Sequence, residues 1–250
     1  MKLDVYATDA EAFEAAAALV ARLLRDAARE RAPAVALSGG RGGRGVMVAL
    51  AGRGDLPWER VEWFWGDERC VPPDDARSNV KLARDSLLVP RGVAAARIHP
   101  PPAALGDPAG VAAAYAETLC ACLGAPTPVF DVVLLGMGRN GHVASLMPGA
   151  AALRATAPVA PVPPEEVSED PRVARITVTP PVLAAARHVV VTVTGAEKAA
   201  PLAAALRDPV DPVRVPAALV RPSPRVLWVV DEAAAGALLA EARPAEPEKA

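Results

Sequence analysis

The segment of residues 129–142 constrains the fold of this chain more than any other. It starts with an almost wholly apolar run, residues 129–135, and the run leads directly into a turn that contains three glycines. An apolar run of this length is typical of a strand that is covered on both faces of a sheet. Glycines allow a tight turn and a close approach of the backbone to a ligand. The segment therefore predicts a buried strand that ends at a ligand-binding edge.

His142 follows the last of these glycines, Gly141. In open α/β folds, ligands bind outside the carboxyl ends of the strands, so the imidazole is expected to lie at such a site. Histidine changes its protonation state near neutral pH, which suits acid–base chemistry. His142 is therefore the first candidate for a catalytic residue.

The rest of the chain alternates between predicted strands and predicted helices. Strands are expected at residues 34–37, 61–65, 129–135, 175–178, 188–193 and 226–230. Helices are expected at residues 10–31, from 46 onward, and at 80–88, 108–123 and 181–187, and again after Gly195. Such alternation predicts a parallel sheet with helices on both faces. We expect a three-layer α/β/α fold with a Rossmann-like, mostly parallel sheet.

The chain is expected to form a single domain over residues 1–240, because neither a repeat period nor a linker divides it. Residues 241–250 are interpreted as a disordered tail. Residues 154–172 are rich in proline and charge, which is typical of an irregular, partly mobile connection on the surface. The sequence leaves open whether this connection covers a bound ligand.

Composition argues against several classes of function. The formal net charge is -2, so the chain has no overall basic field for nucleic acid or a membrane surface. The chain lacks an uncharged apolar run of the roughly 18 residues that a membrane-spanning helix needs, and acidic residues stand near its start, where a signal peptide has its apolar core. Its three cysteines form no paired framework, which argues against an oxidising compartment. We expect a cytoplasmic protein, either a monomer or a small homo-oligomer.

Histidine and cysteine spacing gives no indication of a metal site. His99 and His188 have no cysteine or carboxylate at the spacing of metal ligands. We therefore predict no bound metal.

The segment SGGRGGRG follows one predicted strand and precedes a helix, which is the arrangement of a phosphate-binding loop. Arginine adds charge and bidentate hydrogen bonds to such a site. The candidate phosphate-binding residues in this loop are Ser38, Gly39, Gly40, Arg41 and Arg44. The alternative is an ordinary flexible turn with solvated arginines.

This loop also fits the pattern G-x-G-x-x-G, and so do residues 136–141. A dinucleotide-binding fold needs one such loop, with an acidic residue at the end of the next strand. Two matches in one chain show that the pattern alone is weak. A dinucleotide-binding oxidoreductase is therefore a disfavoured alternative.

A charged segment, GDER, follows the second predicted strand, so its side chains are expected to face the same crevice. Arg69 is a candidate to bind phosphate, and Asp67 or Glu68 to contact sugar hydroxyls or orient a catalytic group. The alternative is a solvated loop. Arg175 and Lys198 are further cations where loops meet strands or helices. Because the sequence has no G-x-S-x-G nucleophile motif, a hydrolase built from these parts would activate water with its histidine.

Taken together, these segments resemble the 6-phosphogluconolactonase family, within the glucosamine-6-phosphate isomerase/6-phosphogluconolactonase superfamily. The resemblance covers nearly the whole chain and rests on LSGG, GDERCVPPDDARSN, FDVVLLGMGRNGHVASLMPG, RITVTPPVLAAARHVVVTVTGAEKA and LWVVDEAAA, in that order. The most specific block is GH-x-ASL-x-PG.

The resemblance implies hydrolysis of 6-phospho-D-glucono-1,5-lactone to 6-phospho-D-gluconate in the oxidative pentose phosphate pathway, without a metal or other cofactor. His142 would deprotonate the water that attacks the lactone carbonyl. Arg69, Arg175, Lys198 and the SGG loop would hold the phosphate.

Two positions depart from the family pattern. The family usually has SGGSTP in the first loop, where this chain has SGGRGG. Asn140 stands where the family usually has an aspartate two residues before the histidine. Asparagine can accept the hydrogen bond that orients the imidazole, but it carries no charge. Asp67 and Glu68 are candidates to supply the missing charge.

Two further alternatives remain. One is a sugar-phosphate-binding protein with weakened catalysis, which Asn140 and the altered loop suggest. The other is an enzyme like glucosamine-6-phosphate deaminase. That group usually carries a glutamate shortly after the histidine, whereas residues 145–148 here contain no acid, which favours the lactonase.

Overall fold

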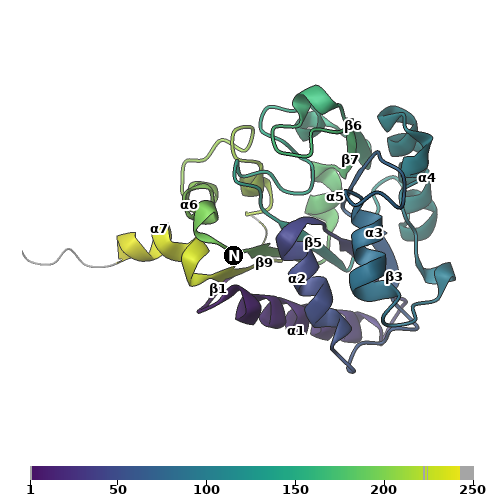
Figure 1. Cartoon of the computed structure of the whole chain (residues 1–250), viewed down its shortest axis with the longest axis horizontal. Coiled ribbons are helices and arrows are strands. Elements are labelled where there is room, and N and C mark those ends of the chain that lie inside the picture. Colours follow the sequence, from purple (N-terminus) through teal and green to yellow (C-terminus); the bar gives the residue numbers. More distant parts are fainter. Residues whose placement is uncertain (1, 222, 224, 243–250) are drawn as a thin grey trace, which may run out of the picture.

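A parallel sheet forms the centre of the computed structural model, which describes residues 2–221, 223 and 225–242 (Figure 1). Each neighbouring pair of its strands runs parallel. In spatial order the strands are β1 (Lys2–Tyr6), β9 (Val226–Asp231), β8 (Val189–Val193), β5 (Val132–Gly136), β2 (Ala34–Leu37) and β3 (Glu62–Trp65). The predicted α/β fold with a mostly parallel sheet is confirmed.

Successive side chains of the central strands point to opposite faces, and both faces are buried. Val133 and Leu135 of β5 belong to one apolar cluster, whereas Val132 and Leu134 belong to the other. The second cluster is completed by α1 (Asp9–Ala27), α2 (Gly40–Ala51) and α3 (Asn79–Ala83). The first is completed by α4 (Pro108–Leu123), α5 (Pro180–Ala185), α6 (Ala199–Leu206) and α7 (Glu232–Ala242).

Short helical turns connect these elements. They are η1 (Arg84–Leu88), η2 (Ala95–Arg97), η3 (Ala103–Leu105), η4 (Ala151–Arg154), η5 (Pro164–Glu166), η6 (Ala196–Lys198) and η7 (Pro216–Leu219). Among the described residues, no helix is long and apolar enough to cross a membrane.

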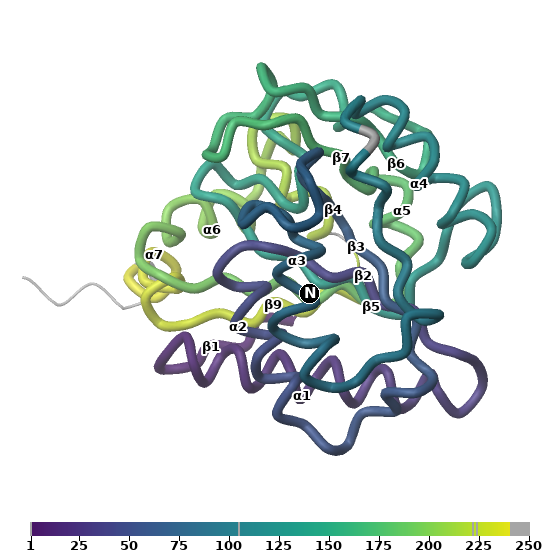
Figure 2. Tube along the Cα trace, turned by 45° about the vertical axis from the view of Figure 1, so that its right-hand side comes forward, coloured from purple at the N-terminus to yellow at the C-terminus, as the bar shows by residue number. Residues whose placement is uncertain are grey.

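A second, antiparallel sheet lies at the end of the molecule opposite α1 (Figures 1 and 2). Its strands, in spatial order, are β4 (Asp67–Arg69), β7 (Arg175–Val178) and β6 (Val159–Val162). Strand β3 passes through Gly66 directly into β4, so the chain leaves the parallel sheet and enters the second sheet at one residue. This sheet was not predicted from the sequence, in which β7 was expected to belong to the parallel sheet.

The prediction of an irregular connection at residues 154–172 is wrong for β6. Val159 and Val162 are buried there, and the strand pairs with β7 along its length. Pro161 obscured this strand in the sequence, because proline cannot donate to a neighbouring strand. It is tolerated here because β6 is an edge strand.

Other boundaries also differ from the prediction. Helix α2 begins at Gly40, not near residue 46, so most of the glycine-rich loop forms its first turns. Strand β1 and helix α7 were not predicted. Two residues of the predicted tail, 241 and 242, belong to α7, and residues 243–250 lie outside the described residues.

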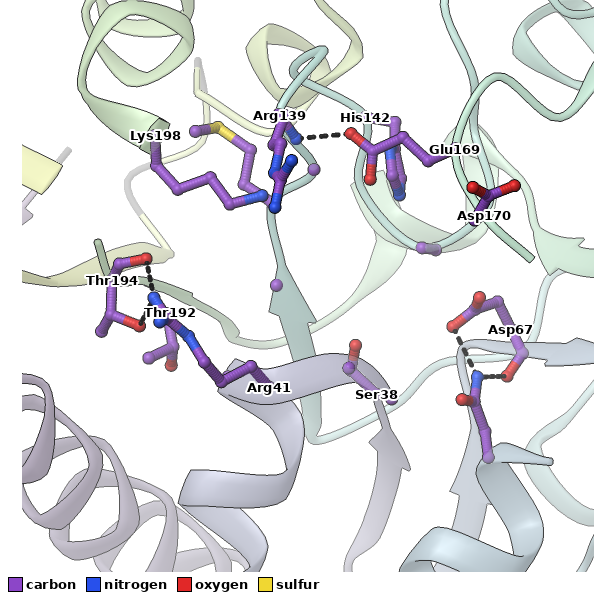
Figure 3. Close-up of a pocket in the computed structure, with 18 of the residues that line it drawn as sticks. Ser38, Arg41, Asp67, Arg139, His142, Glu169, Asp170, Thr192, Thr194 and Lys198 are labelled. Carbon is purple, nitrogen blue, oxygen red and sulfur yellow. Dashed lines mark hydrogen bonds between the residues drawn. The ribbon is translucent and has the colours of Figure 1, made fainter. Parts of the chain in front are cut away.

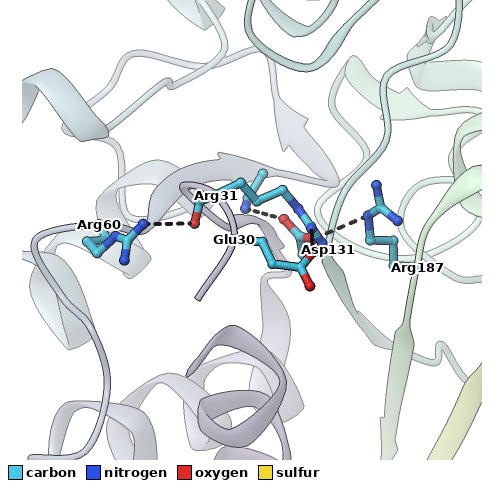
Figure 4. Close-up of polar contacts among 6 residues, drawn as sticks. Glu30, Arg31, Arg60, Asp131 and Arg187 are labelled. Carbon is cyan, nitrogen blue, oxygen red and sulfur yellow. Dashed lines mark hydrogen bonds and ion pairs between the residues drawn. The ribbon is translucent and has the colours of Figure 1, made fainter. Parts of the chain in front are cut away.

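A buried carboxylate joins three segments at the amino ends of β2, β5 and β8 (Figure 4). Asp131 accepts a hydrogen bond from the backbone nitrogen of Ala34 over 2.9 Å and one from Arg31 Nε over 3.0 Å. It also forms an ion pair with Arg187 Nε over 3.4 Å. This cluster ties the strands together at the edge opposite the candidate site.

The strand order places the candidate site. Strands β2 and β5 are neighbours in the parallel sheet. The strand of this sheet that follows β2 in the chain, β3, lies on the far side of β2, whereas the one that follows β5, β8, lies on the far side of β5, so the strand order reverses between β2 and β5. Ligands of open α/β sheets bind at such a reversal, outside the carboxyl ends of the strands. Ser38 and His142 follow β2 and β5 on this side.

Candidate active site

A cavity of about 380 Å³ opens at the carboxyl ends of β2, β5 and β8 (Figure 3). Most of the predicted site residues line it, although they come from distant parts of the chain. They are Ser38, Gly39, Gly40, Arg41, Asp67, Arg69, His142, Arg175 and Lys198. The fold therefore brings the separate sequence motifs together in one place.

Two predicted residues do not line this cavity. Arg44 is exposed one turn into α2, away from the others. The sequence placed it in a flexible loop, but the early start of the helix fixes it elsewhere. Asn140 is also absent from the cavity lining, but its side chain contacts the His142 imidazole.

Glycines hold the loop of His142 in a tight conformation. Gly141 has a φ of +80°, a region that favours glycine. The backbone nitrogen of Gly138 donates to the carbonyl oxygen of His142 over 2.8 Å. A Cβ on Gly138 would lie 2.0 Å from Nδ1 of His142, so the imidazole packs directly against the backbone. This contact fixes the position of the ring.

Asn140 fixes the protonation of the ring. His142 Nδ1 lies 2.7 Å from Asn140 Oδ1, which can only accept a hydrogen bond. The proton of the neutral imidazole must therefore be on Nδ1. Nε2 keeps its lone pair and can accept a proton.

The surroundings keep the His142 imidazole neutral. Burial lowers its pKa to about 4, and the positive charges of Arg175 and Lys198 act in the same direction. The carboxylates of Glu169 and Asp67 act in the opposite direction but do not overcome the burial. At neutral pH, the ring is therefore in the form that a general base requires.

The two acidic residues of GDER have different positions. Asp67 lines the cavity, and its Oδ2 accepts a hydrogen bond from Ser145 Oγ over 2.7 Å. Glu68 is fully buried and accepts from the backbone nitrogens of Asn79 and Val80 over 2.7 and 2.6 Å. Glu68 therefore caps the start of α3 and is not among the charged groups that act on His142, contrary to one alternative from the sequence.

Two guanidinium groups lie side by side in the cavity wall. Arg69 and Arg175 are direct partners across β4 and β7, and both line the cavity. The Nε of each is buried and has no hydrogen-bond partner among the described residues. Burial and the charge of nearby Arg69 lower the pKa of Arg175. Buried donors without partners beside a second positive charge indicate a site for an anion.

Other donors face the same cavity. Gly39 caps α2 without a side-chain hydrogen bond, which leaves the helix N-terminus open to a negative charge. Lys198 is half-buried at the cavity, and its burial lowers its pKa. Arg41 is already engaged, since its Nη2 donates to the carbonyl oxygen of Thr194 over 2.6 Å.

Two residues of the cavity wall, Arg139 and Glu169, were not predicted from the sequence. Figure 3 shows both beside His142, on the side of the cavity away from Ser38. Glu169 Oε1 accepts a hydrogen bond from the backbone nitrogen of Arg139 over 2.7 Å. Arg139 lies within the quoted glycine block and could have been included, but no local pattern connects Glu169 to it.

Known proteins resemble this chain in sequence and in fold. Residues 7–228 match the family described as glucosamine-6-phosphate isomerases/6-phosphogluconolactonase. A 6-phosphogluconolactonase of Mycobacterium leprae is 38% identical over 222 residues, which cover 84% of this chain and 86% of that protein. A 6-phosphogluconolactonase of Synechocystis is 36% identical over 203 residues, covering 80% and 82%.

The fold of a solved relative is also similar. The structure of 6-phosphogluconolactonase from Trypanosoma cruzi matches with a TM-score of 0.86 and 30% identity, over 95% of this chain and 96% of that one. By the matched residues, the identity and the coverage, this chain belongs to the family of glucosamine-6-phosphate isomerases and 6-phosphogluconolactonases.

Proposed function

We propose that this chain hydrolyses 6-phospho-D-glucono-1,5-lactone to 6-phospho-D-gluconate, the lactonase step of the oxidative pentose phosphate pathway. The observation that carries the proposal is a neutral imidazole with a free Nε2, held in the same cavity as two arginines whose buried Nε atoms have no hydrogen-bond partner among the described residues. The relatives named above as 6-phosphogluconolactonases support it.

In the proposed reaction, His142 acts as a general base. Nε2 takes a proton from water as the water oxygen attacks the lactone carbonyl carbon, and a tetrahedral intermediate forms. The bond from this carbon to the ring oxygen then breaks, and the imidazolium returns the proton to the departing oxygen. A positioned base of this kind contributes roughly 10²–10⁴-fold to the rate.

The cations of the cavity would bind the phosphate of the substrate. Arg69 and Arg175 each offer an Nε donor that has no hydrogen-bond partner in the part of the chain that the structure describes, and Lys198 adds a third positive charge. Fixing the phosphate would also fix the lactone relative to Nε2, and such positioning accelerates a reaction by itself. Asp67 would act on His142 through its charge, because its Oδ2 is engaged with Ser145.

The absence of an acid at residues 145–148 continues to favour the lactonase over a deaminase. The hydrogen bond between Asn140 and His142 supports a role for asparagine in orienting the imidazole without a charge. This geometry argues against the alternative that the chain only binds sugar phosphates. Cytoplasmic location and the monomeric or small oligomeric state remain predictions from the sequence.

The test is hydrolysis of freshly generated lactone, measured against the spontaneous rate and against the His142→Ala variant. Turnover above the background that is lost in the variant is the expected result. Background-level hydrolysis by a folded wild-type protein that still binds 6-phosphogluconate would reject the lactonase and select the binding protein. Release of ammonia from glucosamine-6-phosphate would select the deaminase.

A further inference from the structure

The segment that precedes β7 places two polar side chains, Ser168 and Glu169, against Asn140. We propose that both are positioning residues for His142. Ser168 fixes the Asn140 amide, and Glu169 provides the negative charge that an asparagine lacks. The inference rests on the proposed function, because it treats His142 as the base.

A series of hydrogen bonds runs from Met147 through Ser168 and Asn140 to His142, and in each one the donor and the acceptor can be assigned. Ser168 Oγ donates to Met147 Sδ over 3.8 Å, and a thioether sulfur can only accept. The serine oxygen accepts from Asn140 Nδ2 over 2.7 Å. With its amino group held there, Asn140 presents Oδ1 to His142 Nδ1. The series therefore ends with the proton on Nδ1 and the lone pair on Nε2.

A second contact fixes the same orientation independently. The backbone nitrogen of His142 donates to Asn140 Oδ1 over 3.1 Å, and a backbone N–H cannot accept. An asparagine side chain needs a partner for its oxygen and another for its amino group, because the oxygen accepts hydrogen bonds and the amino group donates them. A carboxylate would accept at both ends.

Glu169 acts on both the backbone and the charge of this loop. Its Oε1 accepts from the backbone nitrogens of Arg139 and Asn140 over 2.7 and 3.3 Å. The charged groups that act on His142 are Glu169, Asp67, Arg175 and Lys198, and Glu169 is the stronger of the two carboxylates. When His142 takes a proton from water, the Glu169 carboxylate stabilises the imidazolium that forms.

The same segment is held from the other side by a residue of the anion site. Arg175 Nη2 donates to the carbonyl oxygens of Pro171 and Glu169 over 3.0 and 3.4 Å. Residues 168–171 therefore connect the loop of His142 to a guanidinium group in the cavity wall. Their backbone is held by this arginine, so Ser168 and Glu169 are supported at the position that the proposal requires.

The first test compares Ser168→Ala and Glu169→Gln with Glu165→Gln. Glu165 is an exposed residue of the same segment, outside the cavity lining, so its variant is the matched control. The two test variants are expected to lower kcat roughly 3- to 10-fold, the range for one lost hydrogen bond, with little change in KM. Unchanged kcat in both, or an equal loss in the control, would overturn the proposal.

The second test adds Asn140→Asp to each variant. An aspartate at position 140 supplies a negative charge, and both of its oxygens accept, so either one can face His142 Nδ1. The double variants should therefore recover most of the lost kcat. A residue that merely supported the fold would not be rescued in this way. Failure of Asn140→Asp to restore either variant would overturn the assigned roles.

The third test does not depend on turnover. The imidazole ¹⁵N resonances of His142, assigned by comparison with His142→Ala, report which nitrogen carries the proton. We expect protonated Nδ1 in the ligand-free wild type at neutral pH. In Glu169→Gln, the ring should stay neutral to lower pH than in the wild type. A proton on Nε2 would overturn the proposal. Absence of lactone hydrolysis with the expected resonances would reject only the lactonase function.

Discussion

The imidazole of His142 lies directly against the Cα of Gly138, where a methyl group would come within 2.0 Å of Nδ1. The side chain that carries the proposed chemistry is therefore positioned by the absence of another side chain. This relationship connects the glycine pattern in the sequence to a requirement of the site.

Gly138→Ala is expected to displace the ring and lower kcat by roughly 10²-fold, because small errors in placement of a catalytic group have effects of this size. Lactone hydrolysis by the folded variant is the measurement. Gly236→Ala is the control, since an added Cβ in α7 meets no atom within 4 Å. Equal activity of wild type and Gly138→Ala would contradict the proposed position of the ring.

Removing Arg69 or Arg175 from the anion site should weaken substrate binding more than it lowers the rate of the chemical step. Arg69→Met and Arg175→Met each delete charged donors, and a hydrogen bond from a charged group contributes about 1.5–3 kcal/mol. We expect KM to rise roughly 10- to 100-fold in each variant. Inhibition by inorganic phosphate should weaken in parallel. A change confined to kcat would place the phosphate elsewhere.

His142 should make the stability of the protein depend on pH. Burial lowers its pKa from 6.5 to about 4, so the unfolded chain binds more protons than the folded chain between these values. The free energy of unfolding is therefore expected to fall as the pH falls from about 6.5 to about 4. Urea denaturation across this range should show a shallower pH dependence in His142→Gln. Identical slopes in both proteins would argue against the lowered pKa.

Glu68 is expected to contribute to stability and not to catalysis. Its carboxylate accepts from the backbone nitrogens of Asn79 and Val80 and from Ser78 Oγ. Glu68→Gln turns an amino group toward these donors and should reduce the free energy of unfolding by about 1–3 kcal/mol. Denaturant titration measures this loss. A variant as stable as the wild type would show that the cap is dispensable.

The Asp131 cluster, at the opposite edge of the sheet, is also expected to contribute to stability and not to catalysis. Asp131→Ala removes the carboxylate that accepts from the backbone nitrogen of Ala34. It also removes the shared ion-pair partner of Arg31 and Arg187. We expect a loss of about 1–3 kcal/mol in unfolding free energy, less than for a fully buried pair because both arginines are partly exposed. The kcat of the folded variant should be unchanged, and a large loss of kcat would show that this edge is coupled to the cavity.

Local patterns predicted much of the fold. The apolar runs of β2, β5, β8 and β9 were identified within a few residues, because a strand buried on both faces needs continuous apolar side chains. Strand β6 was missed because Pro161, its one exposed position, interrupts the apolar run that marks a strand. Helix α2 starts earlier than predicted, since glycines in its first turns lower the helix propensity that the sequence analysis used.

The sequence by itself determined the strand, the glycine turn and the histidine of residues 129–142, since backbone preferences act over a few neighbouring residues. Only the tertiary structure decided which charges meet this histidine. Glu68, adjacent to Asp67, caps a helix, whereas Glu169 reaches the loop of His142 from a distant segment. The reason is physical: where a carboxylate lies depends on how sheets pack against each other, and no pattern of neighbouring residues encodes that packing.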